Sequence, residues 1–326
     1  MNNKKLAVLI PAYKAKYMDD VIQGLSLQTY KNFDVFISDD SVGEQITERL
    51  KLLEKRGSLE GLNIQLNTGP KDGRLNHLLL DRQFSPNYDY IHFHHDDDYI
   101  YPTFYEEHLR AHEYGDFAAS ISQRWISNEN NIPFAKPVNV SLGEDNRLFF
   151  PLTIELLTKS SLPHSVNWLG ELTNTVFKGN GNAIFALPPI DTSSLNYYGL
   201  TDIGTFLDLA QTKNLVYIRS YISNWRSHSE QSTHQIGSHG IRLAVLCWLA
   251  YAVKAHNDNL IDDNDLFKAI NRQKSFLTSR VESDDFYEQP LDLIIKNNSL
   301  VGIKEDFTEW WVTLLEIDRL KIKNAW

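Results

Sequence analysis

Short apolar segments alternate with amphipathic segments through the first third of the chain, and this alternation restricts the fold most. The apolar segments have strand character and cover residues 6–10, 33–38, 62–66 and 88–95. Between the first two, apolar residues recur at helical spacing, at Met18, Val21, Ile22 and Leu25. Strands and helices that alternate at this interval form parallel βαβ units. The sequence therefore predicts an α/β fold, with a Rossmann-like, mostly parallel central sheet and flanking helices.

The pattern changes near residue 235. Helical periodicity then dominates, in residues 239–256, 264–277 and 306–323, with few strand signals between these segments. We expect two domains, an α/β domain over residues 1–235 and a helical region over residues 236–326.

Composition and charge exclude several classes of protein. The formal net charge of −10 argues against a general nucleic-acid binder, which needs a basic surface. The single cysteine, Cys247, cannot form an internal disulfide, so we expect a buried core residue and a reducing compartment.

The longest apolar run, residues 243–253, has 11 residues, whereas a bilayer span needs about 20. The apolar run near the N-terminus is too short for a signal peptide. We expect a cytoplasmic protein without a membrane span.

The sequence His-His-Asp-Asp-Asp at residues 94–98 follows the fourth predicted strand. Ligands of open parallel sheets bind at the carboxyl ends of the strands. Adjacent carboxylates repel one another unless a cation compensates, and hard oxygen ligands favour Mg²⁺ or Mn²⁺. The cluster therefore suggests a metal that holds a phosphorylated ligand. The alternative is a solvated acidic loop that caps the next helix.

The other strand ends also carry polar or aromatic side chains, at residues 10–13, 38–41 and 67–77. These groups suit a nucleotide. Ser41 and Glu44 have the spacing of a capping box for the helix that follows the second strand.

These segments carry a resemblance to a known family. "VLIPAYKAKYMDDVIQGLSLQTYKNFDVFISDDS" resembles the opening of family 2 glycosyltransferases with the GT-A fold, and "HDDDYIYP" resembles the metal motif of that family. "GNGNAIF" and "LTDIGTFLDLA" resemble its acceptor-side loop and catalytic helix, and "NWRSHSEQS" resembles its closing Arg-x-His segment. The resemblance covers about residues 1–235.

The resemblance implies a nucleotide-binding set. It places Pro11, Ala12 and Tyr13 against the base, Asp39 and Asp40 at base and ribose, Arg74 at base or diphosphate, and Asp96 at the ribose or the metal. Tyr13 is alternatively a rim residue above the sheet. The alternative for Asp39 and Asp40 is capping of the following helix, and for Arg74 a surface ion pair.

The resemblance also implies a bound Mn²⁺ or Mg²⁺. Counting back from Pro102 makes Asp97 the principal ligand, with Asp98 sharing the metal and His228 as a further metal or diphosphate ligand. His228 is alternatively a buried hydrogen-bonding histidine. Many members of the family have an aspartate where this chain has His95. We expect His92 and His94 to be core residues, because they alternate with apolar residues.

Asp202 matches the carboxylate that the family uses as general base. The family's usual Glu-Asp is Thr201-Asp202 here. The alternative is a helix residue favoured by the macrodipole, and Asp191 is the reserve candidate for the base. The resemblance places Asn182 near the acceptor.

The activity implied is inverting transfer of one sugar from a nucleotide-diphosphate sugar, with UDP favoured, to a hydroxyl of a glycan or lipid-linked glycan acceptor in surface polysaccharide biosynthesis. The Gln-x-x-Arg-Trp motif of processive members does not follow the catalytic helix. The alternative functions are those of a metal-dependent phosphohydrolase and of a non-catalytic nucleotide-sugar-binding protein. A homo-oligomer remains open.

The final helical segment, residues 306–323, combines tryptophans with basic residues near its end. This composition suits peripheral contact with the inner face of the plasma membrane. The alternative is a helix packed on its own domain.

Overall fold

The computed structural model describes residues 4–137, 147–186, 188, 195–231, 238–278 and 303–324. The chain divides into two compact units that interleave along the sequence. Unit 1 comprises Met1–Leu152, Leu169–Phe185 and Lys213–His228, and unit 2 comprises Thr153–Trp168, Ala186–Thr212 and Ser229–Trp326. The expected boundary near residue 235 stays a prediction.

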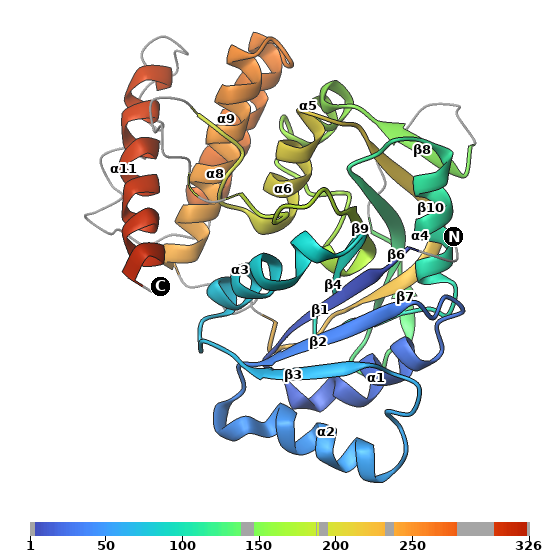
Figure 1. The fold of residues 1–326 in the computed structure, drawn as a ribbon. Coiled ribbons are helices and arrows are strands. Elements are labelled where there is room, and N and C mark those ends of the chain that lie inside the picture. The colour runs from blue at the N-terminus through green and yellow to red at the C-terminus, as the bar shows by residue number, and fades with distance from the viewer. Residues whose placement is uncertain are drawn as a thin grey trace. The chain divides into compact units, whose positions relative to one another are not determined.

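Unit 1 is built on one mixed sheet, which has ten strands in the described part of the chain (Figure 1). Their order is β3-β2-β1-β4-β9-β6-β10-β5, with β7 paired to β6 and β8 to β10. The strands are β1 (Leu6–Ala12), β2 (Phe33–Asp39), β3 (Ile64–Thr68), β4 (Tyr90–Phe93), β5 (Tyr99–Ile100), β6 (Ala119–Ser127), β7 (Pro133–Ala135), β8 (Phe149–Leu152), β9 (Thr175–Lys178) and β10 (Leu215–Arg226).

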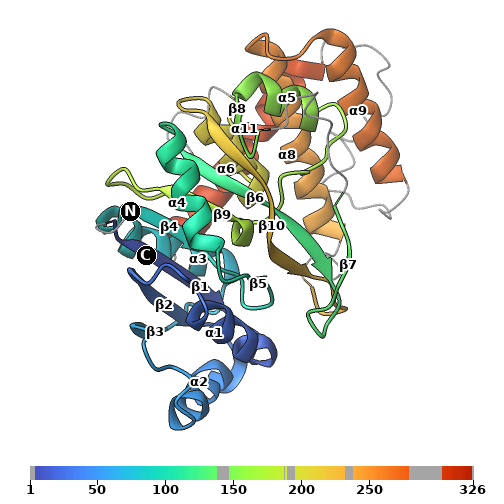
Figure 2. The ribbon, with the colours of Figure 1, turned by 90° about the vertical axis from the view of Figure 1, so that its right-hand side faces the viewer.

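The parallel pairings join β3, β2, β1 and β4 into one block and join β6 to β10. β6 and β10 lie side by side as long strands (Figure 2). The antiparallel β9 connects the two parts of the sheet, since it pairs with both β4 and β6. The predicted α/β fold with a mostly parallel central sheet is confirmed.

Helices cover both faces of the parallel block. α1 (Met18–Ser26) and α2 (Gln45–Lys55) lie on one face and α3 (Gly73–Phe84) on the other, as Figure 1 shows. α4 (Phe104–Tyr114) packs on the same core as α1. β1 is covered on both faces, and Leu6 to Ile10 are all fully buried. Because both faces of the strand are buried, residues 6–10 form an uninterrupted apolar run.

Unit 2 is helical in its described residues. It contains α5 (Ile154–Ser161), α6 (Thr201–Ala210), α8 (Ser238–Asn257), α9 (Asp263–Thr278) and α11 (Ile303–Asn324). α8 contacts both α9 and α11, and Cys247 of α8 is buried, as expected.

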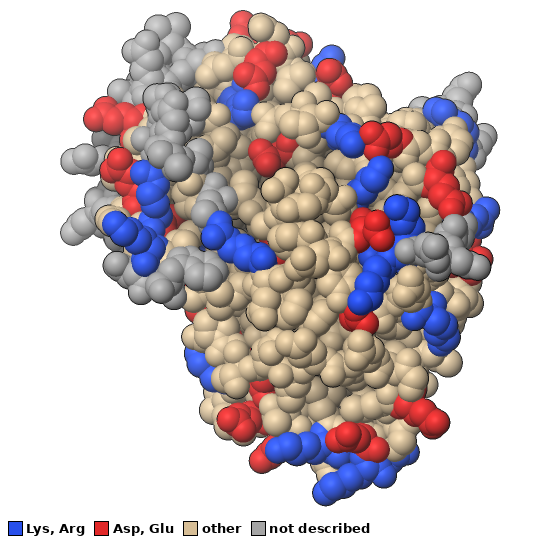
Figure 3. All heavy atoms as spheres, in the orientation of Figure 1, with Lys and Arg blue, Asp and Glu red and all other residues tan. Residues whose placement is uncertain are grey.

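The C-terminal helix α11 buries one face. Phe307, Trp311 and Leu315 recur every four residues and are each at most 4% exposed. This burial supports the alternative that α11 packs on its own domain. Membrane contact stays a prediction. Trp326 lies outside the described residues. None of the described helices combines the length and apolar character needed to cross a bilayer. On the face drawn in Figure 3, acidic and basic side chains are interspersed.

Candidate functional site

The site lies in unit 1, where the carboxyl ends of β1, β2 and β4 are neighbours in the sheet. Ala12 is in register with Asp39, and Leu9 with Phe93. The chain that leaves β4 therefore runs beside the chain that leaves β1. This register brings the acidic loop, residues 94–98, against residues 11–14.

Asp96 fastens the acidic loop to the end of β1. Its Oδ2 accepts hydrogen bonds from the backbone N–H groups of Tyr13 and Lys14, each at 2.5 Å. Asp96 is 7% exposed. Burial and the neighbouring charge of Asp97 raise the pKa of Asp96 to about 6, although the two backbone donors favour its ionised form. The predicted ribose-binding residue is thus also a structural link between two strand ends.

Asp97 is paired with a cation of the protein itself. Its Oδ2 accepts a hydrogen bond from Lys14 Nζ at 2.7 Å, and the same oxygen lies 3.0 Å from His228 Nε2. Burial acts to raise the pKa of Asp97, but the charges of Lys14 and His95 and the hydrogen bonds of Lys14 and His228 together outweigh it, and the pKa is lowered. The same contact raises the pKa of Lys14 against the effect of burial. The expected metal ligand Asp97 is therefore ionised and held by an ammonium group.

Asp98 is held by β10. It is 2% exposed, and its Oδ1 accepts from the backbone N–H of Arg226 at 3.0 Å. Its Oδ2 lies 3.7 Å from His95 Nδ1. The loop therefore has separate anchors on β1 and on β10.

Arg226 is a residue whose role was not predicted. Its guanidinium is buried and donates to the backbone carbonyl oxygens of Asp97 (2.7 Å) and Glu129 (2.6 Å) and to the Asp20 carboxylate (2.6 Å). It also lies over the ring of Tyr17, 4.4 Å from the ring centroid. The Arg-x-His segment was the available signal, because it places Arg226 two residues before His228.

Three side chains of the loop could hold a metal ion. His95, Asp97 and Asp98 each offer a ligand atom, and these atoms lie within 4.8 Å of one another. Imidazole with two carboxylates suits Mn²⁺, whereas Mg²⁺ prefers oxygen ligands alone. The Lys14 contact shows that the Asp97 carboxylate already accepts a cation. The residues present fit a metal, with His95 in the set and His228 in contact with Asp97.

The pair Asp39 and Asp40 is divided between two tasks. Asp39 accepts from the backbone and hydroxyl of Ser41 and of Thr47, and these four bonds cap the turn into α2. These bonds and burial act on its pKa in opposite directions, and the pKa is lowered. The contacts of Asp39 are those of its capping alternative, and its role at the nucleotide stays a prediction.

Asp40 faces the loop after β3. Its Oδ1 accepts from the backbone N–H of Lys71 at 2.5 Å. Gly69 of that loop passes so close that a Cβ there would lie 2.3 Å from the same oxygen. The backbone approach requires glycine at this position.

The predicted base-contacting residues lie at the end of β1. Tyr13 is 59% exposed, whereas Ala12 is fully buried and Pro11 is half-buried. The Tyr13 ring is therefore available to stack on a ligand. Arg74 lies half-buried in the first turn of α3, which Asp72 caps by accepting from Leu75 N at 2.9 Å.

The expected core histidines are in the core. His92 is fully buried between the Tyr105 hydroxyl (3.0 Å) and the Thr173 carbonyl oxygen (2.9 Å). His94 is also fully buried. Burial lowers the pKa of both residues, and that of His94 falls to about 4. Both therefore stay neutral near pH 7.

Asp202, the predicted base, lies in unit 2. It is half-buried in the first turn of α6. The Tyr251 hydroxyl fixes the start of this helix, because it accepts from Leu200 N and donates to the Tyr198 carbonyl, both at 2.9 Å. The reserve candidate Asp191 lies outside the described residues.

Asn182 is exposed in the loop after β9, and the described residues that follow it, 183–186, are not part of a strand. Buried Asp81 anchors this loop by accepting from Ile184 N (2.9 Å) and Phe185 N (2.8 Å).

No family model and no curated protein matches the sequence. Solved structures do match. S. aureus TarS 1–349 in complex with UDP-GlcNAc is similar at a TM-score of 0.58 and 14% identity, over 98% of this chain and 89% of that chain. The same TarS fragment in complex with UDP gives 0.55 and 15%, over 98% and 88%. A longer TarS structure gives 0.55 and 15%, over 98% and 54%. Likeness at this identity identifies a shared fold.

Proposed function

We propose, from the GT-A glycosyltransferase fold that this chain shares with TarS, that it is an inverting, metal-dependent glycosyltransferase. It transfers one sugar from a nucleotide-diphosphate sugar to a hydroxyl of a glycan or lipid-linked glycan acceptor. A UDP-sugar is the favoured donor, since the TarS complexes contain UDP-GlcNAc and UDP.

The observation that supports this proposal most is the junction between the end of β1 and the acidic loop. The segment proposed to contact the base and the segment proposed to bind the cation are joined by the two hydrogen bonds from Tyr13 N and Lys14 N to Asp96. A nucleotide diphosphate needs both features in one place, an aromatic surface for the base and a cation for the phosphates.

The donor would be held by residues at the strand ends. The exposed Tyr13 ring would stack on the base, and Asp40 would accept a hydrogen bond from a base N–H or ribose hydroxyl. His95, Asp97 and Asp98 would hold Mn²⁺ or Mg²⁺. When bound, the metal neutralises charge on the diphosphate leaving group.

Asp202 would act as general base. It takes the proton of the acceptor hydroxyl while that oxygen bonds to the anomeric carbon and the bond to the diphosphate breaks. One displacement inverts the anomeric centre, so a covalent nucleophile is not required.

Thermal unfolding with UDP, GDP and dTDP, each with and without Mn²⁺, tests donor binding. A ligand at 100 times its dissociation constant adds about 2.7 kcal/mol to the stability of the folded state. We expect stabilisation by UDP only with Mn²⁺, its loss in Asp97→Ala, and its retention in Glu54→Gln, an exposed carboxylate on α2. If no nucleotide stabilises the native protein, the proposal fails and the phosphohydrolase reading moves ahead.

Asp202→Asn separates an enzyme from a binding protein. We expect this variant to keep the nucleotide-induced stabilisation and to lose nucleotide release from the donor sugar by about a hundredfold or more. An unchanged release rate would remove Asp202 from the mechanism.

A further inference from the structure

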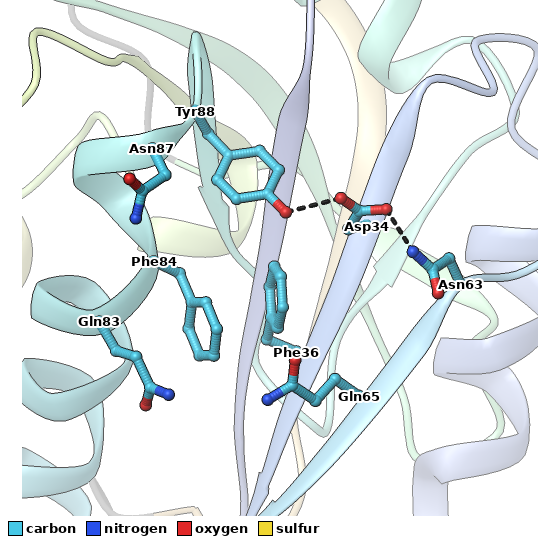
Figure 4. A pocket seen from close by; sticks show the side chains of 8 residues that line it. All are labelled: Asp34, Phe36, Asn63, Gln65, Gln83, Phe84, Asn87 and Tyr88. Atoms are coloured by element: carbon cyan, nitrogen blue, oxygen red, sulfur yellow. Dashed lines mark hydrogen bonds between the residues drawn. The ribbon is translucent and has the colours of Figure 1, made fainter.

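A second pocket lies at the opposite end of the parallel block. It is formed in unit 1 by the first residues of β2, the edge strand β3 and the last turn of α3, and has a volume of about 500 Å³. Its lining consists of Asp34, Phe36, Asn63, Gln65, Gln83, Phe84, Asn87 and Tyr88 (Figure 4). These residues are distinct from those of the site at the carboxyl ends of the strands.

The floor of the pocket is aromatic. The rings of Phe36 and Phe84 are stacked, with centroids 3.7 Å apart, and the Tyr88 ring meets Phe36 edge to face at 5.7 Å. Figure 4 shows the three rings between the helix and the strand. Phe36 and Phe84 are 6% and 8% exposed, so the stacked pair and the half-buried Tyr88 ring offer a small apolar surface to an amphipathic ligand.

The walls of the pocket carry amides. Asn63, Gln65, Gln83 and Asn87 come from both sides of the pocket, and all four are exposed. Each amide offers both a donor group and an acceptor oxygen. Ligands with hydroxyl groups, which also donate and accept, match this set of side chains.

The carboxylate of the pocket is already neutralised. Asp34 forms an ion pair with Lys5 Nζ at 2.6 Å and accepts from the Tyr88 hydroxyl and from Asn63 Nδ2, each at 2.6 Å. These bonds outweigh the effect of burial and lower the pKa of Asp34. The bonds also fix Tyr88 and Asn63, so two lining groups are preorganised for a ligand.

We propose that this pocket binds a neutral sugar ring and is a second carbohydrate site of the protein. A pyranose offers C–H faces to the aromatic floor and hydroxyls to the amide walls. An anionic ligand is disfavoured, because the one charged pair at the pocket is internally balanced. The volume lies within the range of roughly 300–1,000 Å³ that is usual for small-ligand pockets.

The binding of neutral oligosaccharides tests this proposal without reference to transfer or to a nucleotide. The full chain is screened on an array of glucosyl, galactosyl, mannosyl, N-acetylglucosaminyl and N-acetylgalactosaminyl oligosaccharides, and the best probe is titrated by NMR. We expect the double variant Gln83→Ala/Asn87→Ala to weaken binding about tenfold or more, since two hydrogen-bonding side chains are lost. Gln65→Ala, from the opposite wall, should weaken it as well.

Two controls separate this pocket from other surfaces. Gln45→Ala removes an exposed amide from α2 and should leave binding unchanged. Asp97→Asn should also leave it unchanged, because it alters only the other end of the sheet. The proposal is overturned if no oligosaccharide binds or if binding survives the pocket variants, and loss of binding in Asp97→Asn would place the ligand at the other end of the sheet.

Discussion

The two ends of β1 each place a lysine against a carboxylate, but the surroundings differ. Before β1, Lys5 pairs with Asp34 at 2.6 Å and Lys4 pairs with Asp89 at 3.2 Å, so two cations meet two anions. After β1, Lys14 pairs with Asp97 at 2.7 Å, but Asp96 and Asp98 are adjacent in the chain. At the first end, the charges of the two lysines and the two carboxylates balance. At the second end, the carboxylates outnumber the lysine, and a bound cation would neutralise the excess negative charge.

The largest expected difference between the two ends is in catalysis. Asp97→Asn should reduce nucleotide release from the donor sugar by about a hundredfold or more, because it removes a ligand of the metal that stabilises the leaving group. Steady-state kinetics at saturating Mn²⁺ measures this loss.

The matched variant at the other end is Asp34→Asn. It should change the release rate less than about twofold and lower the free energy of unfolding by about 1–3 kcal/mol, because Lys5 and Tyr88 lose a charged partner. Equal losses of turnover in both variants would show that the comparison between the ends is wrong.

The next effect concerns pH and stability. The pKa of Asp96 is raised from 3.8 to about 6, so the stability it contributes is complete below pH 4 and is lost as the pH rises through 6. Relative to Asp96→Asn, the native protein without metal should lose about 2–3 kcal/mol between pH 4 and 7. Urea unfolding of both proteins across this range measures the difference.

Asp34 should behave in the opposite sense, because its pKa is lowered. Its contribution is present above its ordinary pKa of 3.8 and is lost as the pH falls through the folded-state value. The stability gap between native protein and Asp34→Asn should therefore close in acid. For Asp96, the raised pKa is refuted if the free energy of unfolding changes with pH in the same way in the native protein and in Asp96→Asn.

The smallest effect concerns metal affinity. Lys14 Nζ donates to the Asp97 carboxylate, so Lys14→Met should tighten Mn²⁺ binding about tenfold by removing a competing cation. Lys5→Met should leave Mn²⁺ affinity unchanged. Isothermal titration with Mn²⁺ measures both, and weaker binding in Lys14→Met would mean that the ammonium supports the metal site.

Local patterns predicted the fold well, because β1, β2 and β4 are buried along almost their whole length and therefore have apolar sequences. β1 extends to Ala12, beyond the apolar run, because its pairing with β2 continues to Asp39. Pro11 is tolerated there because the pairing of β1 with β4 ends at Leu9. The predicted GT-A fold is confirmed.

The cap of α2 shows where local prediction was wrong. The spacing of Ser41 and Glu44 suggested a capping box, but Glu44 has φ 58° and is the last residue of a 3₁₀ turn. The helix is capped by Ser41 Oγ, which accepts from Ile46 N at 3.2 Å, and by Asp39, which accepts from the backbone and hydroxyl of Thr47. Residue spacing alone does not show that Gly43 adopts a positive φ, 66°, and that the backbone there is therefore not helical.

The sequence located the candidate site but did not reveal its contacts, and the roles of its residues stay predictions. The acidic loop was identified from its position after β4, but Lys14 and Arg226 were not assigned, because they reach it from 83 and 128 positions away. Contacts at such separations are set by the arrangement of the strands in the sheet, which periodicity alone does not give.

The contacts of Arg226 also order the assembly of the protein in time. The Asp98 carboxylate gains its hydrogen-bond donor only when β10 has been synthesised. The ribosome must therefore add more than a hundred further residues after the acidic loop. Closing a loop of this length is entropically unfavourable until the β6–β10 pairing compensates. The nascent chain would thus form its first βαβ units early and acquire a cation-binding loop only near the end of folding.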